Sequence, residues 1–207
     1  MSKLRNALIL TALLSAAPLM SAQPAFAKSS KRYTATLPAD VEAIAIKVVI
    51  GDELQYRADH LSKDIRDRAN SHPGLRNGFA GAGYYGQKEL DRLAKRLKSK
   101  TKARLIKAGV KVDDNAQNVL VLTLTDARPN RPTFNQLSKD TSLSLRSFGV
   151  GGAAIEGVLQ KAGEDAGNVS YAWYETDIRD AYTSGTWTDA NTAIDRFARK
   201  TAKVFKN

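Results

Sequence analysis

Apolar residues follow two different periods along this chain, and each period predicts one type of secondary structure. Where apolar and polar residues alternate, or where Val and Ile occupy both alternating faces, a strand is predicted. Strands are expected on these grounds at 41–50, 118–129, 151–161 and 168–178. The last two flank the stretch AGEDAG, whose glycine and acidic residues are typical of turns, so we expect a β-hairpin there.

Three other segments repeat apolar residues every three or four positions, which is the period of an amphipathic helix. They are 52–70, 87–108 and 187–206. The middle segment is the clearest, because its leucine stripe runs as far as the stop signal at Gly109. In the last segment, Thr186 and Asp189 have the spacing of a capping box. The basic residues near its end, where the helix dipole favours positive charge, are Arg199, Lys200, Lys203 and Lys206.

Irregular structure is predicted between these elements. Residues 71–86 contain five glycines and three aromatic residues, a composition that predicts a mobile loop. Residues 28–40 are polar and basic, and we expect them to form a flexible arm. The order of elements predicts a single α+β domain, or a two-layer α/β domain, over 41–207. Its mixed or antiparallel sheet should have about four to five strands, with three main helices packed on it.

The N-terminus has the features of a secretory signal peptide over residues 1–27. Lys3 and Arg5 precede a short apolar run, and Ala25-Phe26-Ala27 matches a cleavage site. We therefore expect cleavage after Ala27 and a periplasmic or secreted mature protein with no transmembrane helix. Cleavage would lower the formal net charge from +11 to +9, so the mature protein would remain basic. The chain contains no cysteine, which excludes thiol catalysis, thiolate metal sites and a lipid attached to cysteine.

Residues of the C-terminal half resemble a bacterial family of envelope proteins, the domain of unknown function 3313. The similarity is carried by VLVLTLTDARP, by GGAAIEGVLQKAGEDAGNVSYAWYETD and by TDANTAIDRFARKTAKVF, and it spans about 40–205. Members are typically lipoproteins, and this chain departs from them because it lacks cysteine. The resemblance implies an envelope location and this fold, and it implies no catalytic residue.

The stretch FGVGGAAIEGVL at 148–159 fits the loose form G-x-G-x-x-A of a dinucleotide-binding turn. Such a turn must connect a strand to a helix. The residues after Gly152 alternate and include Gly157, so they predict a strand. We therefore expect a glycine-permitted turn into a strand and no nucleotide cofactor.

The predicted helix at 87–108 has a basic face, which makes it the main candidate binding site. The candidate polyanion-binding residues are Lys88, Arg92, Lys95, Arg96 and Lys102. Phe79, Tyr84 and Tyr85 in the preceding loop could stack on sugar rings or bases beside it. The competing interpretation is a solvated helix face, with the loop aromatics packed on the core.

Catalytic and metal-binding patterns are weak in this sequence. His60 could meet a metal together with Asp59 and Asp64, but the two histidines, at 60 and 72, lack H-x-x-x-H spacing. No G-x-S-x-G elbow is present for a serine triad. The remaining candidates for hydrolysis, on neighbouring predicted strands, are Glu156, Glu175 and Asp177. The aromatic residues beside them, expected to serve in packing, are Tyr171, Trp173 and Tyr174.

These features together predict an exported, non-catalytic protein that binds or organises a component of the cell envelope, with no metal and no cofactor. The expected partners are lipopolysaccharide, anionic lipid, cell-wall polymer or an acidic envelope protein. An envelope glycan or lipid hydrolase that uses the strand carboxylates is one alternative. A basic nucleic-acid or polyanion-binding protein is another, which export disfavours.

Overall fold

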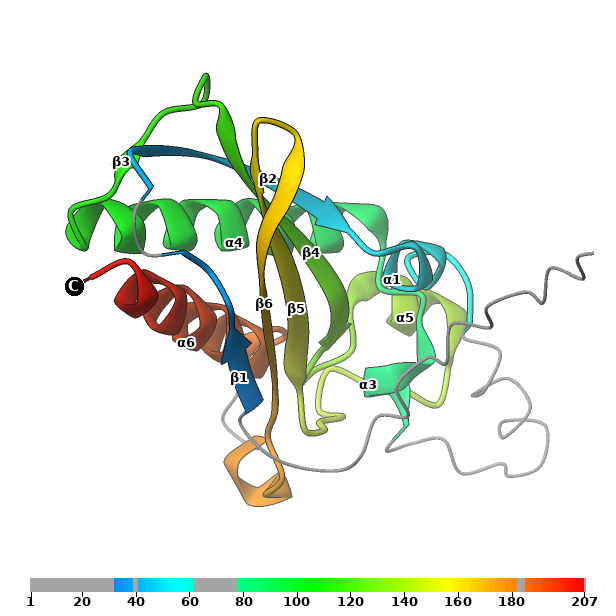
Figure 1. Cartoon of the computed structure of the whole chain (residues 1–207). Coiled ribbons are helices and arrows are strands. Elements are labelled where there is room, and N and C mark those ends of the chain that lie inside the picture. Colours follow the sequence, from blue (N-terminus) through cyan, green and yellow to red (C-terminus); the bar gives the residue numbers. More distant parts are fainter. Residues whose placement is uncertain (1–31, 39–40, 62–77, 182–184, 207) are drawn as a thin grey trace, which may run out of the picture.

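A computed structural model describes residues 32–38, 41–61, 78–181 and 185–206 as a mixed six-stranded sheet with helices packed on it (Figure 1). The order of strands across the sheet is β1-β6-β5-β4-β2-β3. Their bounds are Arg32–Ala35 (β1), Ala43–Ile50 (β2), Lys111–Val112 (β3), Asn118–Arg128 (β4), Gly152–Lys161 (β5) and Glu164–Tyr174 (β6). β2 lies parallel to both β3 and β4, and the other neighbouring pairs are antiparallel.

The α+β class is confirmed, but the expected number of four to five strands is wrong. The two additional strands are β1, with four residues, and β3, with two, and neither is long enough to show alternation. β1 also corrects the prediction of a flexible arm, because Arg32–Ala35 pairs with β6. Residues 28–31 and 39–40 of that predicted arm lie outside the described residues.

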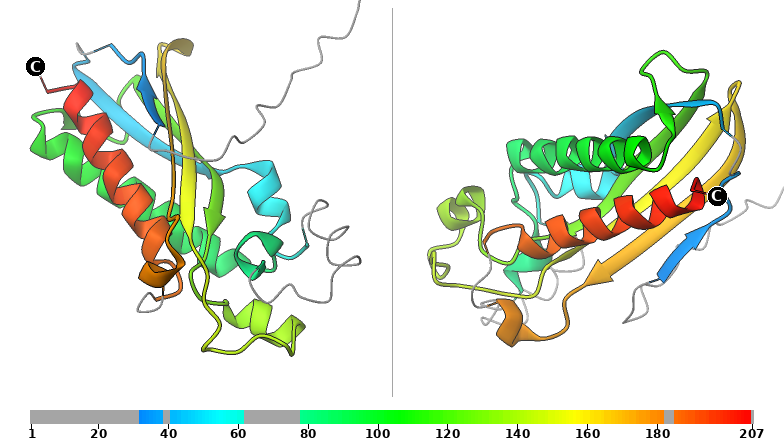
Figure 2. Two further views of the ribbon diagram at one scale, coloured as in Figure 1. Left: turned by 90° about the horizontal axis from the view of Figure 1, so that it is seen from below. Right: turned by 90° about the vertical axis from the view of Figure 1, so that its left-hand side faces the viewer.

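Two long helices cover one face of the sheet. α4 (Gln87–Lys107) and α6 (Thr188–Val204) confirm two of the predicted helices and lie side by side (Figures 1 and 2). The shorter elements are α1 (Asp52–Tyr56), α3 (Phe79–Ala82), α5 (Phe134–Lys139) and a 3-10 turn, η2 (Ile178–Ala181). Among the described residues, no helix has the length and apolar character needed to cross a membrane.

The helix predicted over 52–70 is confirmed only at its start, Asp52–Tyr56. α1 stops at Tyr56, and the described residues as far as Leu61 form turns and a single bridge. Arg57 turns inward immediately after α1 to meet a buried carboxylate, Asp126. Arg57 is therefore the C-cap residue of α1, and its charge is directed into the interior. Residues 62–70 lie outside the described residues.

The hairpin prediction is confirmed, with a tighter turn than expected. Lys161 pairs with Glu164, so β6 begins inside the AGEDAG stretch. The two connecting residues are Ala162 and Gly163, with φ of 52° and 88°. Two positive φ angles in succession are typical of the type I′ turn, whose twist matches that of the flanking strands.

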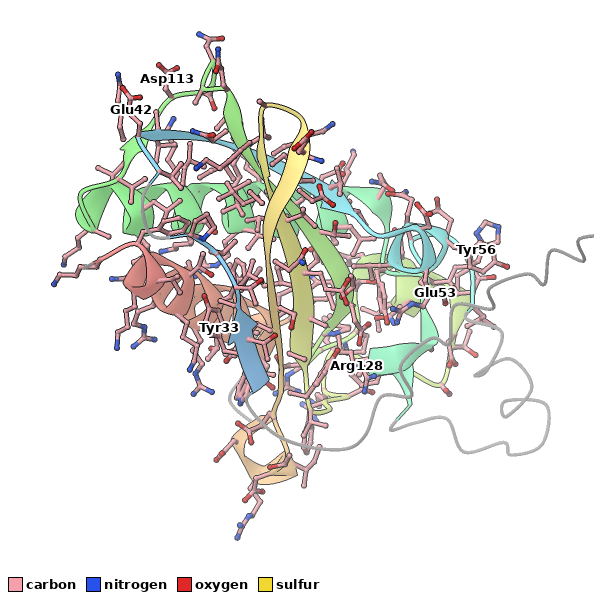
Figure 3. All side chains as sticks on the ribbon, viewed as in Figure 1. Tyr33, Glu42, Glu53, Tyr56, Asp113 and Arg128 are labelled. Carbon is pink, nitrogen blue, oxygen red and sulfur yellow. The ribbon has the colours of Figure 1, made fainter. Side chains whose placement is uncertain are left out.

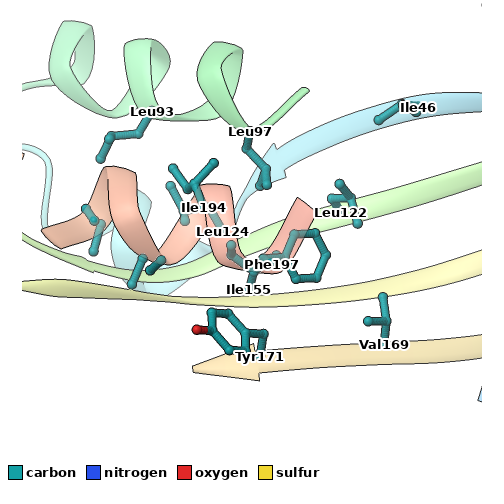
Figure 4. Packing of buried hydrophobic residues seen from close by; sticks show 14 of the residues in the cluster. Ile46, Leu93, Leu97, Leu122, Leu124, Ile155, Val169, Tyr171, Ile194 and Phe197 are labelled. Atoms are coloured by element: carbon teal, nitrogen blue, oxygen red, sulfur yellow. The ribbon is translucent and has the colours of Figure 1, made fainter. Parts of the chain in front are cut away.

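The core lies between the sheet and the two long helices (Figure 4). Leu122, Ile155 and Phe197 meet there with no exposed surface, and Leu97 of α4 is equally buried. Each such side chain contributes about 1.5–3 kcal/mol to folding by leaving water. α6 therefore packs on the sheet through its apolar stripe, which leaves its other faces to carry polar residues.

Candidate functional site

A groove beside α6 is lined mainly by basic side chains. It has a volume of about 290 Å³ and is lined by Tyr171, Arg196, Arg199, Lys200 and Lys203. The four basic residues follow the i, i+3, i+4, i+7 spacing, so they form one stripe along the helix. Nitrogen-tipped side chains project from the α6 side of the molecule, near Tyr33 (Figure 3). We call this hollow the α6 groove.

Aromatic rings hold two of these cations in place. The Arg196 guanidinium lies over the ring of Trp173, 4.2 Å from its centroid. The Lys200 ammonium lies 5.5 Å from the centroid of Tyr33. Tyr33 is in β1, opposite Tyr171 of β6 in the strand register. The short strand that the sequence did not reveal therefore helps to order the α6 groove.

The floor of the α6 groove includes a buried hydroxyl. The Tyr171 side chain is only 2% exposed. Burial raises its pKa, while the positive charges of Arg196 and Arg199 act in the opposite direction. The hydroxyl therefore keeps its proton near neutral pH and can donate a hydrogen bond. Arg196 lies close enough to affect this pKa, but the Tyr171 hydroxyl and Arg196 Nη1 are both buried without a hydrogen-bond partner of normal geometry.

The positive charge of the α6 groove is not neutralised by the described protein. No carboxylate in the described ranges forms an ion pair with any of its four basic residues. The helix dipole accounts for little of this clustering, because its effect falls off within the last turn. Only Lys203 lies in the last turn of α6. The dipole interpretation of these residues therefore does not explain Arg196, Arg199 or Lys200.

The basic face predicted on α4 is present, but its charges are largely compensated. Arg92 pairs with Glu89 at 2.6 Å, Arg96 with Asp195 at 3.0 Å, and Lys102 with Asp114 at 3.8 Å. Lys88 and Lys95 are exposed. The α4 face stays a prediction, and none of these five residues lines the α6 groove.

Two of the three loop aromatics are almost fully buried. Phe79 and Tyr85 are 2% and 0% exposed. Tyr84 is partly buried and lines a second cavity of about 240 Å³ between α3 and α5, with Lys139 over its ring. The loop is anchored because Gln136 donates hydrogen bonds to the carbonyls of Phe79 and Gly83. The expected mobility is therefore wrong for the described residues 78–86, whereas 71–77 lie outside them.

The glycine turn before β5 binds a carboxylate of the protein itself. The Gly151 N–H donates to Asp189 Oδ2 at 2.9 Å, and the Asn130 side-chain amide donates to the same oxygen. In return, the Asp189 N–H donates to Asn130 Oδ1 at 2.9 Å. Asp189 thus does not form the expected capping box with Thr186, and α6 begins without a side-chain cap. Since β5 follows directly at Gly152, the context of a dinucleotide turn is absent.

A second buried network surrounds Asp126, at a register shift in β4. Arg57 Nη2 donates to Asp126 Oδ1 at 2.7 Å, and the Tyr174 hydroxyl donates to Oδ2 at 2.6 Å. Burial alone would raise the pKa of Asp126, but the charges of Arg57 and Arg128 hold it below its ordinary value. Burial and the Asp126 charge raise the pKa of Tyr174, and burial raises that of Tyr85 to about 12. Asp126 thus remains ionised, with its charge fully compensated.

The strand carboxylates are not brought together. Glu175 follows β6 beside Gly151, five residues along β5 from Glu156. At the rise of a strand this separates their backbones by roughly 16 Å, whereas glycosidase carboxyl groups lie about 5–9.5 Å apart. The Glu175 carboxylate also accepts hydrogen bonds from the backbone N–H groups of Thr176 and Asp177. Asp177 is paired with Arg179.

The histidine candidates likewise form no site among the described residues. The His60 ring stacks on Tyr56 with a centroid distance of 4.4 Å. No group of three potential metal ligands occurs in the part of the chain that the structure describes. Asp64 and His72 lie outside it.

Comparisons with known proteins give distant likenesses only. No protein-family model matches the chain, and no curated protein matches it. A PelC dodecamer structure from Paraburkholderia phytofirmans is 9% identical with a TM-score of 0.47, over 86% of this chain and 98% of that one. A minor lipoprotein from Acinetobacter baumannii is 11% identical with a TM-score of 0.37, over 82% of this chain and 93% of that one. At these identities and scores neither likeness carries an argument about function.

Proposed function

We propose that this is an exported, non-catalytic protein that binds an anionic component of the cell envelope through the α6 groove. The observation that carries the proposal is the convergence of four basic side chains, without acidic partners in the described protein, on one hollow above the buried Tyr171. Uncompensated positive charge in a concave site attracts anions. Export is supported by the leader pattern at 1–27, which also limits the partners to envelope components.

The partner classes that fit this charge are lipopolysaccharide, anionic lipid, anionic cell-wall polymer and an acidic envelope protein. Binding in place of catalysis is supported by the separation of Glu156 from Glu175. It is also supported by the enclosure of Asp126 and Asp189 within hydrogen bonds of the protein itself. Both buried carboxylates have structural partners.

The test compares two variants that lose the same charge from different helices. The groove variant carries Arg199→Gln, Lys200→Gln and Lys203→Gln, and the matched control carries Lys88→Gln, Arg92→Gln and Lys95→Gln on α4. All six residues are exposed, so both variants should fold. Binding of each purified protein to isolated bacterial envelope is measured by co-sedimentation at low and at physiological salt.

We expect the groove variant to lose most of the binding and the α4 control to keep it. Wild-type binding should also weaken as salt rises, because screening acts on exposed charges. Loss of binding in the α4 control alone would transfer the site to the predicted basic face. Absence of wild-type binding to envelope at both salt concentrations would overturn the proposed function.

A further inference from the structure

Arg196 is constrained more strongly than an ordinary surface arginine. Its guanidinium rests on the Trp173 ring, and its Nη1 atom is buried without a hydrogen-bond partner in the described protein. A guanidinium has donors in a fixed planar fork, which matches two oxygens of an oxyanion. Arg196 therefore supplies an oriented pair of donors, whereas the exposed lysines of the stripe supply mobile point charges.

Tyr171 adds a neutral donor to that charged one. Its hydroxyl belongs to a residue that lines the same groove, is buried without a hydrogen-bond partner of normal geometry, and keeps its proton because burial raises its pKa. A ligand that satisfied both Arg196 and Tyr171 would need at least three acceptor oxygens close together. A carboxylate has two oxygens and a single charge, whereas a phosphate group has three terminal oxygens and up to two charges.

We propose that the α6 groove recognises a phosphate group, a step that rests on the proposed binding of an anionic envelope component. Arg196 holds two of the phosphate oxygens, and the Tyr171 hydroxyl donates to a third. Arg199, Lys200 and Lys203 lie along about 6 Å of helix, which extends the positive charge to a second anionic group of the same ligand.

The aromatic residues of the groove favour phosphate over an uncharged sugar. The ring of Trp173 has Arg196 over it and that of Tyr33 has Lys200 nearby, so neither face is open for stacking on a sugar. Their role is to position cations. The phosphate could be a monoester on a lipid, as in phosphatidic acid, or on a phosphorylated saccharide, since both present three terminal oxygens.

Titration calorimetry with small anions tests the chemistry directly. Inorganic pyrophosphate is the phosphate probe, and malonate is the dicarboxylate control at equal ionic strength. Arg196→Lys keeps the charge but removes the fork, and Tyr171→Phe keeps the ring but removes the hydroxyl. Arg104→Lys, at an exposed position of α4 outside the groove, is the matched control. Thermal unfolding verifies that each variant is folded. If Arg196→Lys does not fold, Tyr171→Phe alone tests the proposal.

Pyrophosphate should bind at least about tenfold more tightly than malonate. Arg196→Lys and Tyr171→Phe should each weaken pyrophosphate binding about tenfold, while Arg104→Lys changes it less than about twofold. Equal binding of the two anions would overturn the proposal, and so would unchanged pyrophosphate affinity in folded Tyr171→Phe.

Two further measurements separate this inference from the proposed function and identify the source of the phosphate. Groove-dependent envelope binding that malonate displaces and pyrophosphate does not would overturn phosphate recognition alone. Pyrophosphate binding without any envelope binding would overturn the proposed function alone. Binding to phosphatidic acid vesicles but not to phosphatidylcholine vesicles would assign the phosphate to a lipid, and binding to lipopolysaccharide that dephosphorylation abolishes would assign it to a saccharide.

Discussion

Arg57 Nη2 lies 2.7 Å from Asp126 Oδ1, and the two side chains are only 9% and 7% exposed. This pair joins the C-cap residue of α1 to the end of β4. Removing one partner of a buried pair leaves the other charge uncompensated, which costs more than the pair itself contributes. Replacing Arg57 or Asp126 alone should therefore destabilise the protein more than replacing both.

Asp126→Asn is expected to lower the free energy of unfolding by about 3–5 kcal/mol, because Arg57 stays buried with only the exposed and more distant carboxylate of Glu53 as a negative partner. Urea denaturation measures the change. Glu42→Gln, at an exposed position outside this network, removes the same charge and should alter stability by less than about 0.5 kcal/mol. Equal effects of the two substitutions would contradict the assigned importance of the pair.

The stabilisation from Asp126 should depend on pH in a definite direction. Its pKa in the folded state lies below the ordinary value of 3.8, so the folded protein binds this proton more weakly than the unfolded chain. The contribution is therefore fully present above about pH 4 and is lost as pH falls through the folded pKa. In urea denaturation from pH 7 to pH 3, the difference between wild type and Asp126→Asn should shrink below about pH 4. A difference that stays constant over this range would contradict the assignment.

The long elements of this fold could be predicted from sequence because their apolar periods are uninterrupted. α4, α6 and the β5–β6 hairpin were all anticipated in this way. β1 and β3 were missed because each depends on a partner strand distant in sequence. α5 was missed although Thr133 and Gln136 form a capping box, a signal that was present in the sequence.

The α6 groove could not be assembled from sequence for a related reason. The spacing from Arg196 to Lys203 was visible in the sequence, but it has the same appearance as charge placed for the helix dipole. What distinguishes it is the position of Trp173 and Tyr171 beneath the stripe, which follows from how α6 packs on β6. On the predicted α4 face, by contrast, Arg92 and Arg96 form ion pairs with carboxylates.

Asp189 provides a separate test of how the glycine turn is held. Asp189→Ala would leave the Gly151 N–H and the Asn130 amide without their shared acceptor, and unsatisfied buried donors cost about 1–3 kcal/mol. Thermal unfolding should show a Tm that is lower by several degrees. Thr186→Ala is the control, because Thr186 does not cap α6 in this structure, and it should shift the Tm little. A larger decrease in Tm for Thr186→Ala than for Asp189→Ala would instead support the predicted capping box.

Gly152 and Gly149 lie in the same glycine-rich stretch, but only Gly152 is required by its surroundings. A Cβ at Gly152 would come within 2.3 Å of the Trp173 carbonyl oxygen, and its φ of +155° is rarely adopted by other residues. At Gly149 the nearest atom would be a Phe79 ring carbon at 3.6 Å, which is ordinary contact.

Gly152→Ala should therefore lower stability by about 1–3 kcal/mol, and Gly149→Ala by less than about 0.5 kcal/mol, in parallel urea denaturations. A dinucleotide-binding turn would need Gly149 for its tight turn, so a large effect at Gly149 would contradict the strand-entry role. Because Gly152 pairs with Tyr174 beside Trp173, strain there should also disturb the ring that supports Arg196, and Gly152→Ala should weaken pyrophosphate binding more than Gly149→Ala.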